Sequence, residues 1–191
     1  MDKFDDKYAL TGKFLVAMPK INDGDYFDHS LVYICSHGRN GAMGLIVNKR
    51  FDTINFTDLT FQLPVHDFKR LNEVNLYVGG PLEKVRGMVI HSTDYFKEGT
   101  VEIGQGIAVS ATSQIITDIA FDRGPSEKLV ALGYSYWEPH QLEDEIYNND
   151  WLVVEANRNL LFNTPDEEKW QRAIDESGIN LNNFVGITGH S

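Results

Sequence analysis

The sequence has one cysteine, an excess of acidic over basic residues and no long apolar run, and each shortage excludes a class of protein. Because Cys35 is alone, no intrachain disulfide can form, and nothing points to an oxidising compartment. Lysine and arginine number 17 against 28 acidic residues, so the net charge is −11. That charge repels phosphate backbones and disfavours direct binding of DNA or RNA. No stretch approaches the ~18 continuous apolar residues of a membrane span, so no membrane association is expected.

The amino-terminal stretch MDKFDDKYALTGKF is acidic and mixed, and it lacks the apolar core of a signal peptide. We therefore expect a cytoplasmic protein. A chain of 191 residues that is 42% hydrophobic is long and apolar enough to fold around a proper core. We expect a single domain over residues 1–191, with its core at about 9–178 and flexible ends.

Familiar catalytic and cofactor signatures are also missing. The chain contains no GxSxG, CxxC or Walker motif and no Rossmann fingerprint. These absences weaken hydrolase, kinase and dehydrogenase interpretations. We expect no cofactor and no metal, and we assign no catalytic residue. A non-enzymatic protein is therefore favoured, and an unusual enzyme stays open.

The most distinctive stretch is residues 29–49, HSLVYICSHGRNGAMGLIVNK, which is apolar, then glycine-rich, then apolar again. Its first part is rich in β-formers, and Asn40-Gly41 is a strong hairpin signal. We expect strands at 31–35 and 43–47 joined by a turn. Because side chains alternate along a strand, one face is expected to carry His29, Leu31, Tyr33, Cys35 and His37.

The other segments predict strands in hairpin-like pairs, with helices after them. One pair is expected at 71–78 and 87–91 across Gly79-Gly80-Pro81, and another at 101–103 and 107–109. Single strands are expected at 14–18, 129–137 and 151–154. Helices are expected at 57–63, 113–121, 139–149 and 164–177. This arrangement predicts a mixed, largely antiparallel α+β domain rather than a doubly wound parallel one.

Acidic residues in two of these helices have structural explanations. In the last helix Thr164 is expected to cap, Pro165 to take the first position and Glu167 to complete a capping box. The carboxylate of Asp166 is explained by the dipole at that helix start. The acidic segment 138–145 is expected to be a solvated helix face rather than a metal site.

Two candidate sites remain, each beside a simpler structural explanation. Cys35 with His37 and His29 could activate a thiolate, whereas a lone cysteine in a β-rich run is more often a core residue. Glycine-rich turns could hold an anion on their backbone amides, whereas they could equally be plain tight turns. The ligand-binding candidates are His37, Asn40, Gly41, Gly44, Asn48, Gly79, Gly80 and Pro81.

Five segments, in this order, resemble the YqgE/AlgH family of bacterial proteins. They are GKFLVAMPKINDGDYFDHSLVYICSH, NGAMGLIVNK, YVGGPLEKVRGMVIHS, VALGYSYWEPHQLEDEI with NNDWL, and LLFNTPDEEKW. The resemblance runs from Gly12 to Trp170. It implies a bifurcated sheet curled into a pseudo-barrel with flanking helices. It also implies an uncharacterised function, with one branch carrying the label of a transcriptional regulator of polysaccharide production.

These observations favour a binding or regulatory module that acts indirectly. Its partner is unknown, and a protein partner is compatible with the charge. Two alternatives stay open. One is an enzyme or thiol-based sensor that uses Cys35 and His37. The other is a binder of a small anionic ligand at the turns 38–44 and 79–81.

Overall fold

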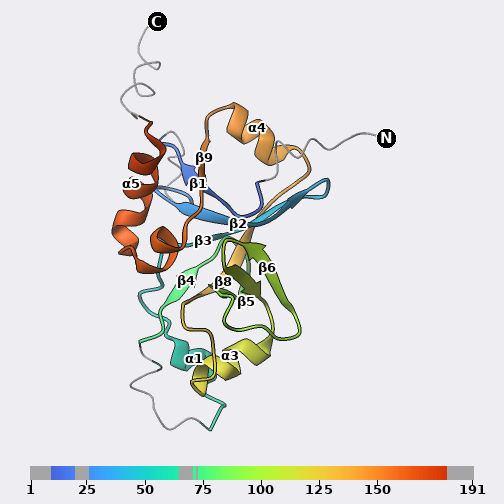
Figure 1. Cartoon of the computed structure of the whole chain (residues 1–191), viewed down its shortest axis with the longest axis vertical. Helices are drawn as coiled ribbons and strands as arrows, with labels where there is room; N and C mark the ends of the chain where they lie inside the picture. The colour runs from blue at the N-terminus through green and yellow to red at the C-terminus, as the bar shows by residue number, and fades with distance from the viewer. Residues whose placement is uncertain (1–9, 20–25, 65–70, 72, 180–191) are drawn as a thin grey trace, which may run out of the picture.

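A strongly curled sheet dominates the computed structural model, which describes residues 10–19, 26–64, 71 and 73–179 (Figure 1). Its strands follow the order β6-β7-β5-β8-β3-β2-β1-β9, and β4 pairs with β8 beside this path. The β4–β8 pair is parallel and the other pairs are antiparallel. The mixed, largely antiparallel α+β class is therefore confirmed.

The sheet divides into two halves that share β8 (Lys128–Trp137). The upper half in Figure 1 contains β1 (Lys13–Ala17), β2 (Leu31–Gly38), β3 (Gly41–Ile46) and β9 (Trp151–Glu155). The lower half contains β4 (Leu76–Val78), β5 (Leu82–Ser92), β6 (Thr100–Gly104) and β7 (Ile107–Ser110). Residues 128–132 and Tyr134 of β8 pair with β5, and residues 135–137 pair with β3, so this strand runs through both halves.

The strand β8 changes partners at Gly133, where three stretches of backbone meet. Gly133 has a φ of +76°, a conformation that costs glycine little. A Cβ at Gly133 would lie 2.7 Å from the oxygen of Gly80 and 2.8 Å from that of Leu82. A Cβ at Gly79 would lie 2.2 Å from the oxygen of Gly133. The bifurcation therefore depends on backbones that pack without side chains between them.

Helices flank both halves of the sheet (Figure 1). They are α1 (Phe56–Thr60), α3 (Ser113–Ala120), α4 (Gln141–Tyr147), the π-helical turn η2 (Asn159–Asn163) and α5 (Asp166–Ser177). α3 buries Ile115 and Ile119 against the lower half, and α5 buries Ala173 and Ile174 in the main core. Within the described ranges, no helix has the length and apolar character needed to cross a membrane.

The main core lies in the concave side of the sheet, where strands of both halves meet α5. Phe14 and Tyr33 pack there edge to face, with ring centroids 5.7 Å apart. Leu45 and Ile90 add fully buried side chains from the upper and lower halves. Because one cluster joins both halves, burial of its apolar surface favours the curled form of the sheet.

The predicted strand pair 71–78 and 87–91 is wrong. β4 and β5 do not pair with each other, because each pairs with β8 instead, β4 parallel and β5 antiparallel. Gly79 donates its backbone N–H to Leu132 and accepts from Ile46, so the turn is packed into the bifurcation. The chain crosses β8 at this point and does not fold back as a hairpin.

The predicted capping box of the last helix is also wrong. The helix α5 begins one residue later than expected, with Pro165 as its N-cap. The hydroxyl of Thr164 donates to the carbonyl of Asn159 at 3.1 Å, so it closes the preceding turn η2 and is not available to cap α5. Gly178 ends the helix as expected, with a φ of +71°.

Candidate functional site

A bulge in β2 separates the two residues of the predicted thiol site. Between Ile34 and Ser36 the pairing with β3 shifts by one residue. An extra residue moves every later side chain to the opposite face of the strand. Ser36 therefore lines the same groove as Cys35, and His37 turns toward α4. The predicted shared face for Cys35 and His37 is therefore wrong. The bulge that separates the two side chains cannot be recognised from the sequence pattern.

Both ring nitrogens of His37 are engaged. Its Nε2–H donates to a carboxylate oxygen of Glu143 on α4 at 3.0 Å. Its Nδ1 accepts the backbone N–H of Leu10 at 3.4 Å. Neither nitrogen is left to take a proton from the thiol of Cys35, so His37 ties β2 to α4 and to the chain before β1.

The thiol of Cys35 is buried in the main core, and the residue is 5% exposed. It contacts the carbonyl oxygen of Tyr33 at 3.7 Å. Burial raises the pKa of the Cys35 thiol to about 12, and it also raises the pKa of Tyr33. Because the thiolate is the nucleophile, a thiol that stays protonated at neutral pH is poorly suited to catalysis.

We expect Cys35 in the folded protein to react with iodoacetamide at least about tenfold more slowly than in the denatured chain near pH 8. The raised pKa means that the folded-state rate rises only as the pH approaches about 12. Mass spectrometry of the alkylated chain measures both rates. A folded-state rate equal to that of the denatured chain, with the pH profile of an ordinary cysteine, would contradict the buried thiol.

Gly41 and Gly44 of the first candidate turn are closely packed against neighbouring strands. A Cβ at Gly41 would lie 2.1 Å from the oxygen of Trp137, and one at Gly44 would lie 2.7 Å from Val32 Cγ1. The turn at Asn40-Gly41 begins β3, whereas Gly79 accepts from Ile46 at the other end of that strand. The structure therefore does not bring the two turns into one anion cradle.

The other polar candidates also have structural partners. Asn48 accepts the N–H of Leu31 at 2.8 Å and donates to the carbonyl of His29 at 2.9 Å, so its amide holds the start of β2. The carbonyl of Asn40 accepts the hydroxyl of Tyr136 at 2.6 Å. Pro81 is half-buried where the chain leaves the bifurcation.

The predicted solvated face of segment 138–145 is wrong for two of its acids. Glu143 holds His37, as described above. One oxygen of Glu145 accepts the indole N–H groups of Trp137 and Trp151, at 2.8 and 2.7 Å. These indoles pack edge to face with centroids 5.8 Å apart. The two carboxylates therefore anchor α4 to the sheet, which the charge pattern alone did not reveal.

A buried polar cluster at the start of α5 was missed by the sequence analysis. Asp166 accepts Lys169 Nζ at 2.6 Å and the hydroxyl of Tyr77 at 3.2 Å, and it pairs with Arg50. Lys169 Nζ also donates to the carbonyl of Val47 at 2.8 Å. Burial lowers the pKa of Lys169 and raises that of Tyr77 to about 12. The contacts are satisfied within the protein, so the cluster joins α5 to β3 and β4.

A second missed network surrounds His91 in the lower half. Its Nδ1 lies 2.9 Å from the carbonyl of Ser92 and its Nε2 lies 2.9 Å from the hydroxyl of Ser110. That hydroxyl lies 2.9 Å from Thr100 Oγ1. Burial lowers the pKa of His91. Because His91 and Ser110 are both buried, this pair links β5 to β7 inside the protein. It is not an accessible nucleophile and base.

An open groove with an apolar lining lies where β6 approaches the β2–β3 hairpin. It has a volume of about 500 Å³. We call it the β6 groove and define it by its lining residues: Cys35, Ser36, Met43, Arg86, Met88, Gly99, Val101, Ile103, Val109, Ala111, Tyr134 and Tyr136.

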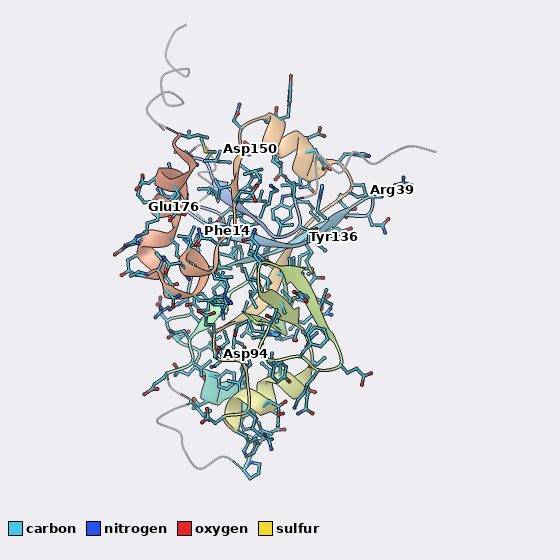
Figure 2. All side chains as sticks on the ribbon, viewed as in Figure 1. Phe14, Arg39, Asp94, Tyr136, Asp150 and Glu176 are labelled. Atoms are coloured by element: carbon cyan, nitrogen blue, oxygen red, sulfur yellow. The ribbon has the colours of Figure 1, made fainter. Side chains whose placement is uncertain are left out.

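The β6 groove has a buried apolar floor and an exposed apolar rim. Cys35, Met88 and Val109 form part of the floor and belong to the main core. Val101 at the rim is 60% exposed, and Tyr136 is 42% exposed. Figure 2 shows Tyr136 close to where the β2–β3 hairpin passes the end of β6. Such a surface can bind an apolar molecule by removing it from water.

No metal chemistry is indicated in the part of the chain that the structure describes. There, no group of three His, Cys, Asp or Glu side chains is placed to hold a metal ion. Among the acids described above, Glu143 holds an imidazole, Glu145 holds two indoles and Asp166 holds an ammonium group.

Comparison with known proteins gives consistent family matches. The AlgH-like family model (DUF179) matches residues 14–182. A UPF0301 protein of Ruegeria pomeroyi is 41% identical over 184 residues, which cover 95% of this chain and 99% of that protein. A UPF0301 protein of Cereibacter sphaeroides is 39% identical over 183 residues, with the same coverage of both chains.

Solved structures share the fold. The solution structure of the AlgH protein from Pseudomonas aeruginosa matches with a TM-score of 0.78 and 33% identity, and it covers 100% of both chains. A crystal structure of a protein from Corynebacterium diphtheriae matches with a TM-score of 0.69 over 96% of this chain and 94% of that one, at 21% identity. The second likeness concerns the fold alone. From the family model and these relatives, the chain belongs to the AlgH-like UPF0301 family.

Proposed function

We propose that this chain is a binding module rather than an enzyme, and that its ligand occupies the β6 groove. The observation that carries the proposal is the combination of a floor from the main core with the exposed side chains of Val101 and Tyr136. An apolar surface that remains open in a folded protein favours a bound partner. The alternatives receive less support, because burial raises the pKa of the Cys35 thiol and because Gly41, Gly79 and Gly80 lie against neighbouring backbone.

Any effect on gene expression would be indirect in this proposal. The net charge of −11 opposes contact with a phosphate backbone. We place the protein in the cytoplasm as a single domain over 1–191, on the sequence arguments given above. A salt-sensitive complex between the purified protein and duplex DNA would refute the indirect part of the proposal.

We expect the neutral apolar dye Nile red to bind the folded protein with a gain in fluorescence. Val101→Glu should weaken this binding by at least about tenfold, because a carboxylate would be placed in an apolar groove. Val85→Glu is the matched control, since Val85 is 93% exposed and lies outside the groove. Fluorescence titration of the three proteins measures the difference, and circular dichroism melts check that each is folded. Equal affinities in all three would contradict the β6 groove as the binding site.

A further inference from the structure

We propose that the ligand of the β6 groove is a small aliphatic molecule with one carboxylate group, which pairs with Arg86. This inference rests on the proposed function, since it names the chemistry of the same groove. Among the described residues that line the groove, Arg86 is the one with a charged side chain. A single guanidinium at the rim of an apolar surface matches a single anionic group on an apolar body.

The guanidinium of Arg86 has N–H donors that a ligand can use. Its Nη1 donates to Glu83 at 3.2 Å, and both side chains are about half exposed. A guanidinium carries five N–H donors, so one such contact leaves others for a ligand. The second oxygen of Glu83 is held by the hydroxyl of Tyr134 at 2.8 Å, which fixes Glu83 beside the groove and not in it. The pair with Glu83 is a surface ion pair of the kind that contributes little.

The rest of the lining favours an aliphatic body. Met43 and Met88 face the groove with Val101 and Val109. Methionine side chains are flexible and fill irregular gaps, so they adapt to a chain that can bend. The volume of about 500 Å³ lies within the range of small-molecule sites. A cationic ligand would be repelled by Arg86, and the single positive charge of one guanidinium would balance only part of a doubly charged phosphate.

The test compares octanoate, 1-octanol and octylamine, which share one hydrocarbon chain and differ in charge. Isothermal titration of the full chain should show octanoate binding at least about tenfold more tightly than 1-octanol, with octylamine weakest. Arg86→Gln should make the affinities for octanoate and 1-octanol equal. Glu83→Gln should tighten the binding of octanoate but not that of 1-octanol, because it removes the carboxylate that competes for Arg86. Arg172→Gln is the control, since Arg172 pairs with Glu168 on α5 away from the groove.

The outcomes separate this inference from the proposed function. If 1-octanol or octylamine binds as tightly as octanoate, or if Arg86→Gln leaves the affinity for octanoate unchanged, the carboxylate assignment is wrong. The same holds if octanoate fails to bind while Nile red binds and responds to Val101→Glu, and in that case the groove itself stands. If Val101→Glu also leaves the affinity for Nile red unchanged, the proposed function is wrong as well as the carboxylate assignment.

Discussion

Asp166→Asn is expected to lower the free energy of unfolding by about 3 kcal/mol, because it leaves Lys169 buried without a counter-charge. The side chain of Lys169 is 2% exposed, and its ammonium group lies 2.6 Å from Asp166. An amide at position 166 can still accept hydrogen bonds, but it cannot balance the charge. Denaturant unfolding of the variant and of the wild type measures the loss.

The matched control is Glu168→Gln on the same first turn of α5. Glu168 pairs with Arg172 on the surface, with both side chains about half exposed, so its loss should cost less than about 1 kcal/mol. Both changes remove one carboxylate from the helix start and affect the helix dipole alike. Equal losses for the two variants would show that the buried cluster contributes no more than a surface ion pair.

The same variant should show an altered pH dependence. Burial already lowers the pKa of Lys169, and the loss of Asp166 lowers it further. Between that depressed value and the unfolded value of about 10.4, the unfolded chain binds more protons than the folded one, so stability rises with pH. Stability of Asp166→Asn relative to the wild type is therefore expected to improve as the pH increases. Adding Lys169→Met should remove this dependence.

Gly133→Ala is expected to cost at least about 3 kcal/mol, or to prevent folding, because a methyl group would be forced against two carbonyl oxygens. These oxygens belong to Gly80 and Leu82, which are part of the packed bifurcation. The change adds steric conflict to the cost of a positive φ. Thermal unfolding and the yield of folded protein measure the effect.

Gly178→Ala separates the two costs. Gly178 has a φ of +71°, close to the +76° of Gly133, but a Cβ there would meet no atom of the described residues within 4 Å. This variant should lose only about 1 kcal/mol, the cost of a positive φ for alanine. If both alanine variants lose the same amount, close packing of backbones at the bifurcation does not limit the fold.

Local patterns in the sequence predicted the local structure well. The turn at Asn40-Gly41 joins β2 and β3, and the apolar spacing of Ile115 and Ile119 places α3 on the sheet as expected. Predictions that failed depended on events that leave no local signal. A one-residue bulge moved His37, and close backbone packing at Gly79 replaced a hairpin with a crossing of β8.

Long-range partners account for the sites that the sequence could not reveal. Tyr77 and Asp166 are 89 residues apart in the chain, and Lys169 is 122 residues from Val47. The β6 groove likewise collects residues from Cys35 to Tyr136. Each is an ordinary residue in its own segment, and only the curl of the sheet brings them together. Polar pattern alone therefore pointed to the glycine turns and missed the groove.

A methyl NMR titration with octanoate and 1-octanol shows whether a ligand occupies the β6 groove. We expect intermolecular Overhauser contacts from the hydrocarbon chain of at least one ligand to the methyl groups of Met43, Met88 and Val101. We expect no such contacts to Ile174, a buried residue of α5. Contacts confined to other surfaces would contradict a ligand-binding β6 groove, and so would the absence of contacts from either ligand together with Nile red binding that Val101→Glu leaves unchanged.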